Sequence, residues 1–147
     1  KLQYVPFDYY LHDIGICLHK AGKDDKAISY LEEGARLAKE VERNADILAV
    51  FYCDVAISYK DSENFQEAER FADKSVELDP NFTLSWFVKA ISQSKLNRKA
   101  EAFESLKSAS GINADVLKWL AYPKNKSYFD EETITKLENH MKCEQNK

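Results

Sequence analysis

Glycine and proline are scarce in this sequence, with four glycines and three prolines among 147 residues. An all-β fold needs many turn formers, so this scarcity argues against one and favours long helices. No apolar run approaches the roughly 20 residues that a membrane-spanning helix needs. No signal peptide is visible either. The sequence therefore predicts an all-α protein that does not enter a membrane.

Charge and cysteine content exclude further classes of protein. The net charge is −4, and no block of Lys or Arg forms a stripe, so neither nucleic acid nor an anionic membrane surface is an expected partner. The three cysteines are Cys17, Cys53 and Cys143, and no C-x-x-C pair occurs. An odd, unpaired set of this kind is typical of reduced thiols, so we expect a cytoplasmic protein without a disulfide framework.

Three stretches of the sequence align on small and large residues without a gap. They are LHDIGICLHKAGKDDKAISYLEEGA (11–35), YCDVAISYKDSENFQEAERFADKSVELDP (52–80) and WFVKAISQSKLNRKAEAFESLKSA (86–109). Each opens on a large residue: Leu11, Tyr52 and Trp86. The shared small positions follow at fixed spacing: Gly15, Ala56 and Ala90, then Ala27, Ala68 and Ala102, then Gly34, Ser75 and Ala109. Such self-similarity indicates a repeat architecture.

This spacing resembles the tetratricopeptide repeat, whose period is about 34 residues. The second and third stretches are separated by 86 − 52 = 34 residues. The resemblance implies that each unit is a pair of antiparallel helices, A and B, which meet through small residues and stack into an α–α superhelix. Pro80 follows the second B helix and ends it. An ordinary helical bundle with coincidental alanines is the alternative, and three units in one register argue against it.

One domain is predicted over residues 1–147, with three repeats and a C-terminal extension. The repeats span 8–48, 49–82 and 83–114, and capping helices with a tail span 115–147. The first two stretches lie 52 − 11 = 41 residues apart. We expect the seven extra residues to lengthen the first B helix by about two turns.

The C-terminal extension is predicted to cover the end of the stack. Pro123 prevents a full fourth repeat, so a short helix over 115–122, a polar loop at 123–127 and a last helix capped by Asp130 are expected. The last helix has an apolar face of Ile134, Leu137 and Met141. We expect this face to pack against the end of the stack, and the alternatives are occupation of the groove or disorder.

A binding groove follows from the resemblance, because A helices line the concave surface of tetratricopeptide stacks. The resemblance assigns three rows of groove residues: Tyr9, Val50 and Leu84, then His12, Cys53 and Phe87, then Ile16, Ile57 and Ile91. The rows are mostly apolar, and an exposed apolar patch is unusual on a monomer. We therefore expect a partner peptide, a second subunit or the protein's own tail to cover it, unless a tighter superhelix or additional chain buries these residues.

Some members of this family bind the acidic C-terminal tails of chaperones through a clamp of Lys, Asn and Arg. The matching positions here are His12, Ile16, Asp54, Leu84 and Val88, and none carries the family's residue. A carboxylate at Asp54 repels another carboxylate, and the other four offer no fixed cation. The sequence therefore predicts that chaperone C-terminal tails are not partners.

Catalysis has weak support in the sequence. His12 and His19 lie seven residues apart on one helix, and Cys53 follows on the next A helix, so a Cys–His pair or a metal site is conceivable. Their spacing matches no established metal site, and we expect no enzyme activity, no cofactor and no metal.

The predicted function is a scaffold that binds a peptide or partner helix in an apolar groove. The alternatives are a self-association module, or a docking or sensor appendage of a larger enzyme or regulator. The chain opens on Lys1 rather than Met, which allows for a missing larger part.

Overall fold

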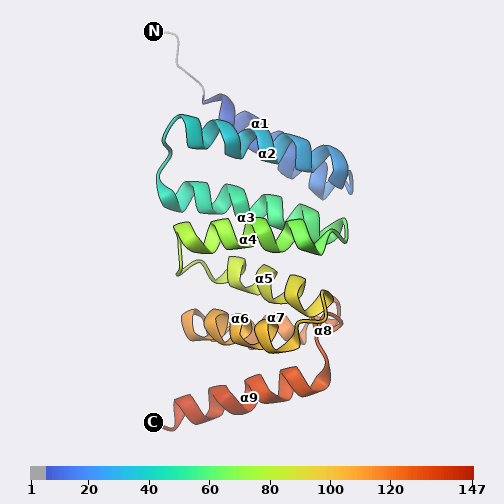
Figure 1. The fold of residues 1–147 in the computed structure, drawn as a ribbon, viewed down its shortest axis with the longest axis vertical. Helices are drawn as coiled ribbons and strands as arrows, with labels where there is room; N and C mark the ends of the chain where they lie inside the picture. The colour runs from blue at the N-terminus through green and yellow to red at the C-terminus, as the bar shows by residue number, and fades with distance from the viewer. Residues whose placement is uncertain (1–5) are drawn as a thin grey trace.

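The structure is a computed structural model that describes residues 6–147. It is built from stacked helices. Within this range the chain forms nine helices and no strand. They are α1 (Phe7–Lys20), α2 (Asp24–Glu40), α3 (Ala45–Asp61), α4 (Phe65–Leu78), α5 (Thr83–Lys95), α6 (Lys99–Ile112), α7 (Val116–Ala121), α8 (Pro123–Lys126) and α9 (Glu131–Gln145). The stack runs from α1 at the N-terminal end to α9 at the C-terminal end (Figure 1). In the range described, no helix combines the length and apolar character needed to cross a membrane.

Helices α1 to α6 form three antiparallel pairs, which we call the first, second and third units. Each pair is joined by a three-residue turn, and the middle residue of every turn has a positive φ: Gly22 at 70°, Glu63 at 61° and Asn97 at 61°. This left-handed conformation suits Gly and Asn and costs energy at Glu63. The A helices are α1, α3 and α5, and the B helices are α2, α4 and α6, so the predicted superhelix of paired helices is confirmed.

Small residues allow the two helices of a unit to approach closely. Ala27, Ala68 and Ala102 are almost completely buried between paired helices. A Cβ atom added at Gly15 would lie 2.5 Å from Cγ of Leu31, and one added at Gly34 would lie 3.1 Å from the backbone oxygen of Asp8. No side chain fits in these gaps without displacing the opposite helix. The small positions of the repeat therefore set the spacing of the helices.

The extra length of the first repeat is shared between two helices. Helix α2 ends 13 residues after Ala27, whereas α4 ends 10 residues after Ala68, a difference of three. Helix α3 begins 11 residues before Ala56, whereas α5 begins seven before Ala90, a difference of four. The expected two-turn extension of the first B helix is therefore wrong in size.

Packing explains why the extension is shared. The added turn of α2 places Ala38 against Leu48 and Phe51 near the start of α3. Ala38 and Leu48, one from each extended end, are both buried in this cluster, so the added length of each helix contributes to the packing between α2 and α3.

The C-terminal helices close the far end of the stack. Asp130 caps α9, because its side chain accepts a hydrogen bond from the Thr133 backbone N–H at 2.8 Å. Leu137 and Met141 of α9 are buried in the cluster that contains Leu106 of α6, so the expected packing against the end of the stack is confirmed. The segment expected as a polar loop is instead the single-turn helix α8, with Pro123 at its first position, where proline is tolerated in a helix.

Replacing Gly15 tests the close approach of α1 and α2. Gly15→Ala places a methyl group against Cγ of buried Leu31, so we expect a loss of about 1–3 kcal/mol in the free energy of unfolding. Gly111→Ala is the matched control, because nothing lies within 4 Å of its new Cβ. Alanine favours helix over glycine, so this control gains up to about 1 kcal/mol. Urea denaturation measures both, and equal shifts in the two variants would show that the contact with Leu31 does not limit the packing.

Candidate protein-binding surface

The surface formed by the A helices α1, α3 and α5, here called the A-helix face, carries the nine predicted groove residues. They divide by burial into three groups. Val50 is exposed; Tyr9, His12, Ile16, Ile57 and Leu84 are half-buried; and Cys53, Phe87 and Ile91 are buried. Ile16, Ile57 and Leu84 pack on one hydrophobic cluster although they come from three different helices. The accessible part of the face therefore lies over α1, α3 and the first turn of α5.

The chain itself covers the A-helix face in the third unit. The Phe87 ring lies 5.5 Å from that of Trp119 and 6.2 Å from that of Phe129, measured between centroids. Ile91 belongs to the same buried cluster as Val116 of α7. The Ser94 hydroxyl donates a hydrogen bond of 2.6 Å to the backbone oxygen of Tyr128, which holds the covering segment in place. Segment 116–129 thus occupies the part of the predicted groove over α5.

Aromatic rings and one ion pair build the N-terminal corner of this face. The Tyr9 ring lies edge-on to Phe51 with centroids 5.5 Å apart, and the Arg43 guanidinium lies 4.9 Å from the centre of the Tyr9 ring. Arg43 also donates two hydrogen bonds, of 2.8 and 3.0 Å, to the buried carboxylate of Asp8. The Arg43 guanidinium holds the pKa of Asp8 below its ordinary value. Asp8 and Arg43 therefore hold the ring of the groove residue Tyr9 in place.

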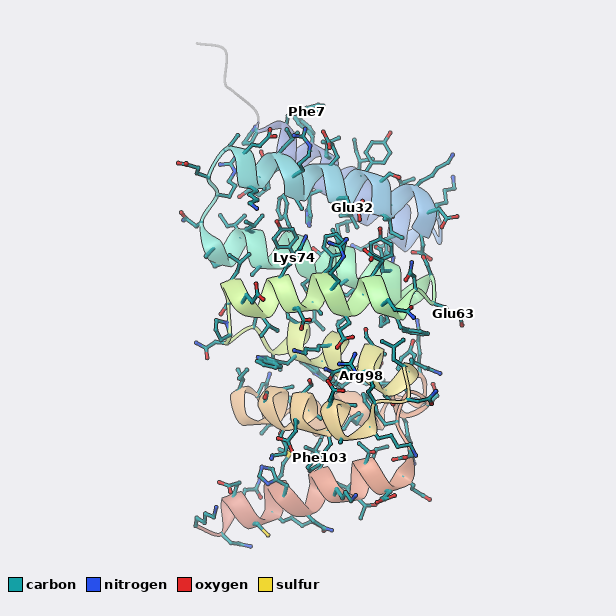
Figure 2. The ribbon with its side chains drawn as sticks, in the orientation of Figure 1. Phe7, Glu32, Glu63, Lys74, Arg98 and Phe103 are labelled. Carbon is teal, nitrogen blue, oxygen red and sulfur yellow. The ribbon has the colours of Figure 1, made fainter. Side chains whose placement is uncertain are left out.

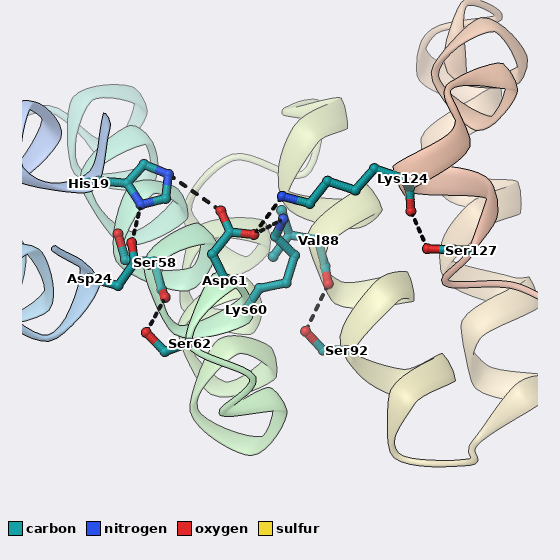
Figure 3. A network of polar contacts seen from close by, with 10 residues as sticks. All are labelled: His19, Asp24, Ser58, Lys60, Asp61, Ser62, Val88, Ser92, Lys124 and Ser127. Carbon is teal, nitrogen blue, oxygen red and sulfur yellow. Dashed lines mark hydrogen bonds and ion pairs between the residues drawn. The ribbon is translucent and has the colours of Figure 1, made fainter. Parts of the chain in front are cut away.

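Both histidines of the first unit contact aspartates of α3. His12 Nε2 lies 2.7 Å from Asp54 Oδ2, and the His12 ring stacks on Phe51 at 4.2 Å. His19 Nδ1 lies 2.7 Å from Asp24 Oδ1, and its Nε2 lies 3.4 Å from Asp61 Oδ2 (Figure 3). These contacts tie the first unit to the second. They also engage both imidazoles as hydrogen-bonding groups.

A polar network at the edge of the A-helix face joins three parts of the chain through Asp61. Its carboxylate lies 2.8 Å from the Lys60 ammonium and 3.5 Å from that of Lys124 in α8 (Figure 3). Burial raises the pKa of Asp61, but the Lys60 ammonium and neighbouring cations outweigh burial and hold it below its ordinary value. A cleft of about 420 Å³ lies beside the network, with Lys60 and Lys95 each 5.5 Å from the centre of the Tyr128 ring.

The thiol that the sequence placed near the histidines is buried in this fold. Cys53 is 1% exposed, and burial raises the pKa of its thiol to about 12. A thiol of this kind stays protonated near neutral pH, whereas catalysis and metal binding need the thiolate. Among residues 6–147, no group of three or more His, Cys, Asp or Glu side chains is arranged to hold a metal ion.

A second cleft, which the sequence did not indicate, lies on the opposite side between the B helices α2 and α4. Its volume is about 530 Å³, and Tyr52 and Phe71 contribute aromatic walls. The Lys74 ammonium lies 4.7 Å from the centre of the Phe71 ring, and Glu32 of α2 lies on the same side of the stack (Figure 2). Burial, together with Arg70 and Lys39, lowers the pKa of Lys74. The repeat pattern points only to A helices, so nothing in the sequence singled out this cleft.

Paired helices stacked in a single file define a helical-repeat protein whose accessible faces suit protein binding. The tetratricopeptide repeat family model matches residues 9–81. The TPR domain of Arabidopsis OM64 has a similar fold, with a TM-score of 0.67 at 20% identity over 90% of this chain and 95% of that one. The chain therefore belongs to the tetratricopeptide repeat family.

A longer protein shares part of the sequence. The mitochondrial import receptor subunit TOM70 of Rattus norvegicus is 33% identical over 87 residues, which are 59% of this chain and 14% of that protein. The human TOM70 is 32% identical over the same length. The match thus spans about one seventh of the relatives' length.

The exclusion of chaperone tails is overturned by two solved structures of this fold. The first TPR of Spaghetti (RPAP3), bound to the HSP90 peptide SRMEEVD, has a TM-score of 0.67 at 16% identity, covering 91% of this chain and 94% of that one. The second TPR domain of human RPAP3, in complex with the HSP70 peptide SGPTIEEVD, has a TM-score of 0.65 at 16% identity, covering 89% and 98%.

The five clamp positions were too narrow a basis for that exclusion. Asp54 is paired with His12 rather than free, and Val88 is buried in the core. Lys60 and Lys95, which lie outside the five positions, place cations at the edge of the same face.

Acid should weaken the corner around Tyr9. Because the folded pKa of Asp8 lies below that of the unfolded chain, its stabilisation is complete above about pH 4 and is lost as the pH falls through the folded value. We expect Asp8→Asn to cost about 1–3 kcal/mol at pH 7, as for hydrogen bonds to a charged group. The deficit relative to wild type should shrink at pH 2. Asp13→Asn is the control, since that side chain is 78% exposed, and urea denaturation at both pH values gives the comparison. A deficit that does not change with pH would contradict the assigned role of the Asp8 charge.

Proposed function

We propose that this chain is a single protein-interaction domain whose A-helix face binds a segment of a partner protein. The observation that carries the proposal is the contrast along this face. Over α5 the face is filled by the chain's own Trp119 and Phe129. Over α1 and α3 the side chains of Ile16 and Ile57 stay half-buried, whereas their counterpart Ile91 on α5 is buried.

The covering segment indicates the chemistry of the ligand. Segment 116–129 contacts α5 through aromatic and aliphatic side chains and fastens its backbone to Ser94. A partner segment with similar apolar anchors can extend this arrangement along α3 and α1, where Ile57 and Ile16 continue the row begun by Ile91. The proposed role is binding rather than catalysis, because the Cys53 thiol, which the sequence placed near the histidines, is buried.

Acidic C-terminal peptides are the first ligands to examine, because two structures of this fold hold them. In this chain the exposed Lys95 at the edge of the face would meet the carboxylates, while Ile57 and Leu84 would contact the apolar side chains. A second candidate role is that of a docking module within a longer polypeptide, which the greater length of the TOM70 relatives favours. The cytoplasmic location remains a prediction.

A substitution on the open part of the face tests the proposal. Ile57→Asn places an amide where an apolar contact is proposed, so we expect it to weaken partner binding at least tenfold, in the range of an interface hot spot. Ile112→Asn is the matched control, since Ile112 is 39% exposed at the end of α6, away from this face. The measurement compares both variants with wild type in affinity capture from cell extract, followed by mass spectrometry.

Labelled SRMEEVD and SGPTIEEVD, titrated by fluorescence anisotropy, test the ligand class separately. Binding that Ile57→Asn and Lys95→Gln both weaken supports an acidic peptide ligand on this face. Partners captured equally by wild type, Ile57→Asn and Ile112→Asn would place the interaction elsewhere on the molecule and contradict the proposal.

A further inference from the structure

The N-terminal end of the stack exposes a row of large apolar side chains, here called the end face. It consists of Phe7, Tyr10 and Ile14 on α1 and Tyr30 on α2, with exposed fractions of 61%, 51%, 43% and 40%. The three residues of α1 follow i, i+3, i+7 spacing, so they share one side of the helix. Phe7 lies at the extreme end of the stack (Figure 2). Single exposed apolar residues are common, but a contiguous row marks an interaction site.

The end face is the counterpart of a surface that is buried inside the stack. The first and second units align with an offset of 41 residues, which relates Gly15 to Ala56 and Ala27 to Ala68. The same offset relates the four end-face residues to Leu48, Phe51, Val55 and Phe71, whose exposed fractions are 7%, 2%, 0% and 5%. The end face of the first unit is therefore equivalent to the surface of the second unit that packs against the first unit. The difference is that the end face is exposed.

A helix with small side chains covers that surface in the second unit. Ala35 and Ala38 of α2 pack with Leu48 and Phe51. Ala27 and Leu31 of α2 share a cluster with Val55 and Phe71. Large residues of one unit thus fit against three alanines and one leucine of the helix before it, and such alternation of large and small residues fills a helix interface.

A second copy of this chain fits the end face badly. Two end faces in contact would set Phe7, Tyr10 and Tyr30 against equally large side chains, without the small residues that allow close packing. The opposite end of a second copy is polar, because α9 turns exposed Thr135, Glu138 and Lys142 away from the stack. Within residues 6–147, neither end of the stack therefore supplies a surface like the one that α2 offers to α3.

We propose that the end face docks an α-helix of a partner protein that carries small apolar side chains. The contacting positions of that helix follow the spacing i, i+4, i+8, i+11, which is the spacing of Ala27, Leu31, Ala35 and Ala38 in α2. The partner helix lies across α1 as α2 lies across α3. This site is separate from the A-helix face, so one chain can hold two partner segments at once.

The chain itself supplies a probe for this site. A synthetic peptide of residues 24–41, DDKAISYLEEGARLAKEV, carries the required small residues. When it is titrated into ¹⁵N-labelled protein, we expect shift changes confined to the end face, at Phe7, Tyr10, Ile14 and Tyr30. An isolated helix of this length is only partly formed in water, so the affinity will be low and is best followed by NMR.

Matched variants decide whether the peptide binds as proposed. Ile14→Asp should weaken binding at least tenfold, and so should Ala35→Glu within the peptide. Val50→Asp should not, because Val50 has a similar exposed fraction of 40% but lies on the A-helix face. Circular dichroism confirms folding, and Tyr10→Ser gives a second end-face variant that should weaken binding as well.

Three results would overturn the proposal. They are no shift change with the peptide, shift changes that persist in Ile14→Asp, and sedimentation of the wild type as a dimer that Ile14→Asp dissociates. The last result would assign the end face to a second copy. Ile57→Asn should leave peptide binding unchanged, so failure here is distinct from failure of the function proposed for the A-helix face.

Discussion

The close approach of two helices within each unit is the constraint on which the rest of the structure depends. At Gly15 the opposite helix comes so near that even a methyl group would meet the buried Leu31 side chain. This spacing aligns the A helices on one side and the B helices on the other, and so decides which side chains a partner can reach. Small residues carry no binding chemistry themselves, yet their positions determine where the apolar rows and the end face lie.

The two ends of the stack differ in the side chains that they expose. At the C-terminal end, α9 buries Leu137 and Met141 and turns polar residues outward, which is how terminal repeats keep a helical stack soluble. At the N-terminal end, α1 keeps Phe7, Tyr10 and Ile14 exposed, although their counterparts in the second unit are buried. This asymmetry gives the stack a direction and leaves one end open to further helix packing.

Polar contacts between the units accompany their apolar packing. His12 contacts Asp54 and His19 contacts Asp61, so each histidine of the first unit meets an aspartate of the second. Asp61 also contacts Lys124 of α8, which links the covering segment to α3 across the edge of the face. Asp61 therefore takes part both in the contact between the units and in the contact with the C-terminal segment.

Local sequence rules determined the repeat units, their antiparallel helices, the role of Gly15 and the cap at Asp130. Each depends on residues close in sequence or on a spacing that recurs, so the pattern itself contains the information. Only the tertiary structure decided that segment 116–129 lies over Phe87, because that contact joins residues some 30 to 40 positions apart and no periodicity encodes it. The same holds for the pairing of Asp54 with His12, which turned an apparently free carboxylate into part of an inter-unit contact. Exposure, too, was decided by stacking: Ile14 and Val55 occupy equivalent repeat positions, and only the presence of a preceding helix makes one buried and the other open.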